Sequence, residues 1–117
     1  MSEITVQSQS TAFKIGWWIL VALSVVSVLG HAALLFAEPG EEILFLGWVA
    51  FPFFALVVLF IPYRRGERWA WAVTWVMVLA FALVPLFSAE IGLYYLAIAG
   101  LLALGQLLTG SALVSMQ

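Results

Sequence analysis

The sequence predicts an all-α integral membrane protein, built as an up-down-up-down bundle of four transmembrane helices. Composition is the first observation, because 66% of the 117 residues are hydrophobic and only 9% are charged. A soluble domain is nearer half apolar and a quarter charged, so a single core of this length cannot hide so much apolar surface from water. The second observation is that the apolar residues form four runs, each close to the ~20 residues that cross a bilayer as a helix.

The four spans are expected to follow a short polar tail within one domain. We place the tail at residues 1–12 and the spans at about 13–37, 42–61, 67–87 and 91–114. Long continuous apolar runs favour helices, because the strands of a barrel would alternate in polarity over about ten residues. The turns between the runs are short, so sequential helices should pack as antiparallel neighbours.

Glycine and proline residues mark the expected turns and bends. Pro39-Gly40 suits a type II turn in which glycine takes a positive φ angle. Gly66 allows the backbone to reverse after the second span. Pro52 and Pro85 fall inside apolar runs, where each should bend its helix because it removes a backbone hydrogen bond.

The basic residues predict the orientation of the bundle. Lys14 precedes the first span, and Arg64, Arg65 and Arg68 lie between the second and third spans. The other two turns contain no Lys or Arg. Because Lys and Arg in short loops favour the cytoplasmic side, these residues predict that both termini are cytoplasmic. The turn from Tyr63 to Trp71 is typical of small prokaryotic membrane proteins, so the predicted location is a prokaryotic plasma membrane.

Aromatic residues are concentrated near the ends of the spans, where amphipathic rings favour the headgroup region of a bilayer. The predicted interfacial belts contain Trp17, Trp18, Tyr63, Trp69 and Trp71 on one side, and Tyr94 and Tyr95 on the other. Span two also carries Trp48, Phe51 and Phe54, each three residues apart, so one of its faces is aromatic. Such a face either packs against a neighbour or receives a flat hydrophobic ligand such as a quinone, carotenoid or sterol.

Span one contains the most informative polar residues. Ser24, Ser27 and His31 share one helical face, and ionisable residues inside a membrane are functional candidates. Proton relay, ligand anchoring and metal ligation are compatible with this face. A neutral histidine with a purely structural hydrogen bond is the alternative. In either case the face should point into the bundle, where His31 could bond to Ser27, Tyr94 or water.

Span four carries a stripe of small residues that permits close helix contact. Ala99 and Ala103 lie four residues apart and lead to Gln106, whose amide can hydrogen-bond across an interface. We expect the stripe to face protein, either inside the bundle or in a second subunit.

The sequence lacks the residues that several classes of function require. The chain contains no cysteine and no aspartate, and its net charge of -2 gives no reason to expect nucleic-acid binding. A single histidine with peripheral glutamates completes neither a catalytic set nor a recognisable metal or haem site. We therefore expect no enzyme activity, no metal and no cofactor.

The leading prediction is a small non-enzymatic membrane protein, acting as an accessory or assembly subunit or as a homo-oligomer, with membrane lipid around it. The alternative is binding or transport of a small hydrophobic ligand, such as a lipid, a quinone, a carotenoid or a drug-like molecule, in an aromatic-lined pocket. The candidate ligand-binding residues are Ser24, Ser27, His31, Trp48 and Gln106.

Overall fold

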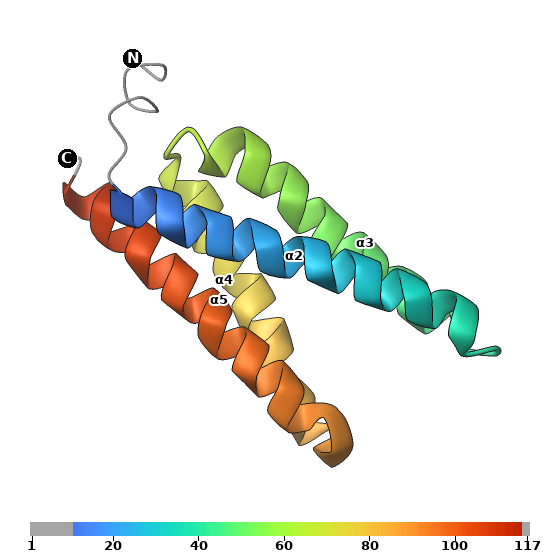
Figure 1. Ribbon diagram of the computed structural model, residues 1–117. Coiled ribbons are helices and arrows are strands. Elements are labelled where there is room, and N and C mark those ends of the chain that lie inside the picture. Colours follow the sequence, from blue (N-terminus) through green and yellow to red (C-terminus); the bar gives the residue numbers. More distant parts are fainter. Residues whose placement is uncertain (1–10, 116–117) are drawn as a thin grey trace.

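The computed structural model describes residues 11–115 and contains four long helices without strands in that range (Figure 1). They are α2 (Thr11–Ala37), α3 (Glu42–Val58), α4 (Arg68–Ala82) and α5 (Ala89–Ser115). α3 continues into a π-helical turn, η1 (Leu59–Tyr63), and α4 is followed by a 3-10 turn, η2 (Val84–Leu86). With these extensions, all four helices are long and apolar enough to cross a membrane. Their ends differ from the expected ones by two residues at most.

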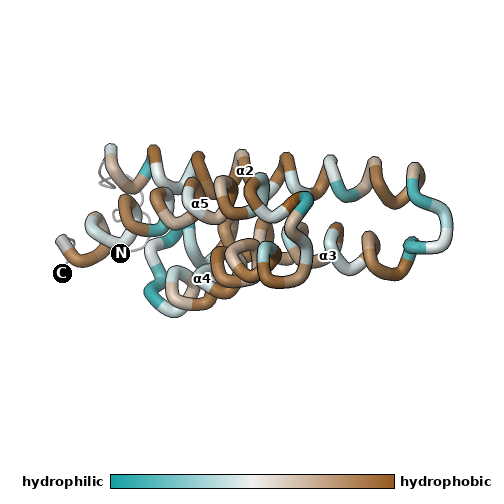
Figure 2. Tube along the Cα trace, turned by 90° about the horizontal axis from the view of Figure 1, so that it is seen from below, coloured by the Kyte–Doolittle hydropathy of each residue, from teal (hydrophilic) through white to brown (hydrophobic). Residues whose placement is uncertain are grey.

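Consecutive helices run in opposite directions, so the molecule has two chemically different ends. Lys14, Arg64, Arg65 and Arg68 lie at the end where α2 begins and α5 finishes, which we call the basic end (Figure 1). The α2–α3 and α4–α5 turns, with Glu38, Glu41, Glu42 and Glu90, lie at the opposite, acidic end. Figure 2 shows hydrophilic residues at the turns and hydrophobic residues along most of the helices.

The first and last helices form the centre of the fold. α2 makes its most extensive contacts with α5 and α3, and α4 packs mainly on α5. α3 and α4 contact each other least of these pairs, although a short turn joins them. The α2–α3 hairpin and the α4–α5 hairpin consequently diverge toward the acidic end (Figure 1). The expected contact between sequential helices is therefore present but least extensive for α3 and α4.

Two glycines bring α2 and α5 into backbone contact. A Cβ atom added to Gly16 would lie 2.5 Å from the Gly105 carbonyl oxygen, and one added to Gly105 would lie 2.9 Å from that of Gly16. Both distances are shorter than a Cβ contact allows, so only glycine permits this approach. The neighbouring small-residue stripe of α5 also faces protein, because Ala99 and Gln106 are buried and the half-buried Ala103 packs against the core.

Several other glycines and prolines lie in the turns or inside the helices. Gly40 and Gly66 have φ angles of 93° and 79°, as expected for these turns. Pro52 lies inside α3. Pro85 does not bend a continuous helix, because α4 ends before it and Pro85 belongs to η2. A Cβ on Gly92 would lie 2.9 Å from the Pro85 Cα atom, so α5 begins close against this turn.

The predicted aromatic belts are only partly correct. Trp18, Trp69 and Tyr94 are well exposed, as an interfacial belt requires, but Trp17 and Tyr63 belong to the core. Neighbouring residues such as Trp17 and Trp18 point in directions about 100° apart on a helix, so a cluster in sequence is divided between the core and the surface.

Replacing Gly16 or Gly105 with Ala should destabilise the fold, because the added methyl group forces α2 and α5 apart. Overpacking of this kind costs about 1–3 kcal/mol. Gly100→Ala on the same helix as Gly105 is the matched control, since no atom lies within 4 Å of the added Cβ. Thermal unfolding in a mild detergent should separate the variants, and equal melting temperatures for Gly105→Ala and Gly100→Ala would contradict the backbone contact.

Candidate functional site

Four ring side chains, one from each helix, meet between the two hairpins. We call His31 (α2), Trp48 (α3), Phe81 (α4) and Tyr95 (α5) the aromatic quartet. The rings of His31 and Trp48 are stacked with centroids 5.4 Å apart, and those of Phe81 and Tyr95 are stacked at 5.5 Å. Trp48 lies 5.8 Å from Phe81 and 6.1 Å from Tyr95. These spacings are those of favourable aromatic pairs, so the quartet joins all four helices.

Two hydrogen bonds determine the tautomer of the neutral His31 ring. Its Nδ1 atom lies 2.8 Å from the Ser27 carbonyl oxygen, and its Nε2 atom lies 2.6 Å from the Tyr95 hydroxyl. A carbonyl only accepts, so Nδ1 carries the proton and Nε2 must accept from Tyr95. The Tyr95 oxygen then has acceptor capacity left and no second proton to donate.

A cavity of about 630 Å³ adjoins the quartet where the hairpins diverge. His31, Trp48 and Tyr95 contribute to its wall, and Glu41 and Ser88 are its other polar or charged lining residues. The rest of the lining is apolar and comes from α3, the end of α4, the turn that contains η2 and the beginning of α5. A mainly apolar hollow with a few converging polar groups is the usual form of a small-molecule site.

A second polar cluster lies toward the basic end, with Tyr63, Gln106 and Thr109 fully buried. The Tyr63 hydroxyl donates to Gln106 Oε1 and also lies within hydrogen-bond distance of Thr109 Oγ1. Gln106 Nε2 donates to the Trp71 carbonyl oxygen, and Trp71 Nε1 donates to the Gln106 carbonyl oxygen, both at 2.8 Å. This network joins η1, α4 and α5, and the described residues contain no buried side-chain nitrogen or oxygen without a partner.

The structure divides the sequence-predicted residues between these two places. His31 and Trp48 meet in the quartet, and Ser24, Ser27 and His31 point into the bundle as expected. The Ser24 hydroxyl approaches the Met77 sulfur at 3.6 Å, whereas Gln106 belongs to the other network. His31 bonds to Tyr95 and not to Tyr94.

Neither Tyr95 nor Phe81 is among the candidate ligand-binding residues that the sequence predicts. The sequence pattern places Tyr95 in the interfacial belt, and Phe81 is one of several aromatic residues in the spans. One signal was available for Tyr95, which lies four residues before buried Ala99 and therefore on the same helical face as the small-residue stripe.

The predicted topology determinants have different local contacts. The Arg64 guanidinium lies 5.4 Å from the Trp17 ring centroid, a cation–π contact. Arg65 forms an exposed ion pair with Glu67 at 3.5 Å. Lys14 and Arg68 are exposed. Within residues 11–115, no three His, Cys, Asp or Glu side chains are grouped as metal ligands would be.

Comparisons of the chain with known protein families, with curated proteins and with solved structures found no match.

The Thr109 hydroxyl should contribute measurably to stability. Thr109→Val keeps the shape of the side chain but leaves the buried Tyr63 hydroxyl with one partner fewer, which should cost about 1–3 kcal/mol. Ser111→Ala is the matched control, because Ser111 is exposed and bonds only to the carbonyl of Leu108 in its own helix. Unfolding titrations should show a loss for Thr109→Val alone, and similar results for both variants would argue against the network.

Proposed function

We propose that this chain is a non-enzymatic integral membrane protein that binds a small planar hydrophobic molecule in the cavity beside the aromatic quartet. The observation that carries the proposal is the combination of a cavity of about 630 Å³ with stacked rings and one hydrogen-bonded polar pair in its wall. Drug-sized ligands occupy pockets of about 300–1,000 Å³ with this kind of lining.

The polar pair specifies the chemistry of the ligand. With His31 neutral, Tyr95 donates its only proton to Nε2, so its oxygen can serve a ligand only as an acceptor. The ligand we propose therefore carries a hydroxyl or N–H donor on an aromatic body, as phenols and quinols do. Within the quinone class suggested by the sequence, this arrangement favours the reduced form.

The geometry of His31 supports binding over catalysis. Both of its ring nitrogens already have partners, the Ser27 carbonyl and the Tyr95 hydroxyl. Ser88 also lines the cavity, but His31 is not available as a base to remove the proton of its hydroxyl. The remaining acid of the lining, Glu41, lies in the turn at the acidic end.

The alternative is an accessory subunit or a homo-oligomer, which the scarcity of ionisable residues inside the spans suggests. An exposed stripe of small residues would favour it, but Ala99 and Gln106 of the α5 stripe are buried within the chain. The cavity beside His31 favours the ligand-binding hypothesis.

Binding can be tested with 2-naphthol and 2-methoxynaphthalene, which share a ring system but differ in the donor proton. Calorimetric titration into the protein in nanodiscs, with empty nanodiscs as the blank, should show tighter binding of 2-naphthol. One hydrogen bond of about 1 kcal/mol corresponds to roughly fivefold. Tyr95→Phe should remove this preference, and Tyr94→Phe should keep it, because Tyr94 is exposed and is not the residue bonded to His31.

A cavity-filling variant distinguishes this site from dissolution in lipid. Ala80 lines the cavity, so Ala80→Phe should abolish binding of both naphthalenes. If neither compound binds above the blank, or if Ala80→Phe leaves binding unchanged, the proposed function is wrong.

The proposed location is a prokaryotic plasma membrane, with the basic end and both termini in the cytoplasm. The chain has no cysteine, so single cysteines can report the topology directly. Glu38→Cys at the acidic end should react with an impermeant maleimide on intact cells, whereas Glu67→Cys at the basic end should react only after lysis. Labelling of Glu67→Cys but not of Glu38→Cys on intact cells would show that the basic end lies outside the cell.

A further inference from the structure

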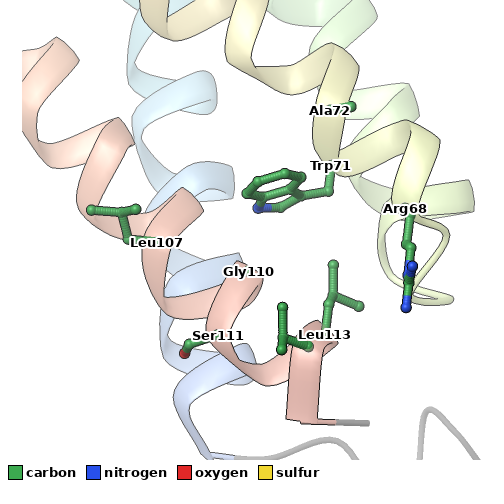
Figure 3. Close-up of a pocket in the computed structure, with 8 residues that line it drawn as sticks. Arg68, Trp71, Ala72, Leu107, Gly110, Ser111 and Leu113 are labelled. Atoms are coloured by element: carbon green, nitrogen blue, oxygen red, sulfur yellow. The ribbon is translucent and has the colours of Figure 1, made fainter. Parts of the chain in front are cut away.

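A second hollow lies on the outside of the bundle at the basic end, and none of the quartet residues lines it. It is a groove of about 550 Å³ between the first turn of α4 and the last turns of α5 (Figure 3). In Figure 3, Trp71 and Leu113 point into the space between the two helices, and Arg68 flanks it from the start of α4. Ala72, Leu107 and Val114 complete the apolar part of its wall.

The shape of the groove is fixed by the residues around it. Trp71 is held against α5 by the two reciprocal hydrogen bonds with Gln106. Gly110 leaves room for the indole ring, because a Cβ there would lie 2.9 Å from Trp71 Cζ2. The groove is thus a preformed feature of the α4–α5 contact.

The charge around the groove is positive. Arg68 is the only charged residue in its lining, and the nearest acid in sequence, Glu67, is paired with Arg65. Among the described residues, no ion pair involves Arg68. Two other hollows on the outer surface of α3 and α4, beside Phe51 and Val76, have no charged lining residue. The groove with Arg68 is therefore suited to a negatively charged group, and the other two hollows are not.

We propose that this groove binds an anionic phospholipid, with its headgroup at Arg68 and part of one acyl chain along Trp71 and Leu113. Arg68 begins an apolar helix and so lies at the level where headgroups meet hydrocarbon. The α5 part of the groove extends from Leu107 to Val114, which is about 10 Å along a helix axis and covers part of an acyl chain. Basic pockets between transmembrane helices recognise acidic lipid headgroups in this way.

Tryptophan quenching provides the test, because Trp71 lies in the groove. The full chain is placed in vesicles of phosphatidylcholine that contain a small fraction of dibrominated phosphatidylglycerol or dibrominated phosphatidylcholine. Brominated acyl chains quench only nearby indoles, so a bound anionic lipid should quench more than its neutral counterpart at the same fraction. Trp18 and Trp69 are exposed at the same end and also report general attraction of an anionic lipid, so variants are needed to separate the groove from the surface.

Two arginine variants separate a site from general attraction to a basic surface. Arg68→Gln should weaken the apparent affinity for the anionic lipid roughly fivefold, the effect of about 1 kcal/mol for one basic residue near the surface. Arg65→Gln removes the same charge from the same end but outside the groove, and should leave the preference nearly unchanged. Ala72→Phe fills the groove while keeping Arg68, and should reduce the preference as well.

Three outcomes would overturn the proposal. Equal quenching by the two brominated lipids in the unmodified chain would show that the groove does not select a headgroup. Equal losses for Arg68→Gln and Arg65→Gln would assign the preference to the basic end as a whole. Quenching that falls as the protein concentration rises, whatever the lipid, would assign the groove to a second copy of the chain.

Discussion

The backbone contact between Gly16 and Gly105 is the constraint on which the rest of the structure depends. It brings the first and last helices together near the basic end, where no other residue type would allow the same approach. Helices that touch closely at one end and carry larger side chains at the other must diverge. The divergence creates the space at the acidic end in which His31, Trp48, Phe81 and Tyr95 meet and in which the cavity lies.

The two ends are held together by different interactions. In hydrocarbon, helices gain little from burying apolar surface, so close packing and interhelical hydrogen bonds must hold them. The basic end has both, because the glycine contact lies beside the bonds among Tyr63, Gln106 and Thr109. Trp17 adds a further bond of 2.7 Å to the Leu59 carbonyl of the π-helical turn. Toward the acidic end, the described residues join the hairpins through the His31–Tyr95 hydrogen bond and a set of stacked rings. Opening should therefore occur at the acidic end first.

The sequence predicts the helices well and their partners poorly. Span positions follow from apolar run length and from turn chemistry at Gly40 and Gly66, and both signals are local. The pairing of α2 with α5 depends on Gly16, which is one of two glycines in an apolar helix, and no periodic pattern distinguishes it from Gly30. The same limit applies to the site. His31 is identifiable because it is the only histidine, whereas choosing Tyr95 over Tyr94 requires the rotation of α5. That rotation is set by Gly105 and Gln106 packing elsewhere on the helix.

The direction of hydrogen-bond donation along Ser27, His31 and Tyr95 follows from the Ser27 carbonyl. The Ser27 carbonyl can only accept, so the neutral ring is fixed in one tautomer and Tyr95 in one donor direction. The Tyr95 oxygen then keeps its acceptor capacity and has no second proton to donate. A backbone carbonyl on α2 thus decides, through one imidazole ring, which hydrogen-bonding group a side chain of α5 has left over.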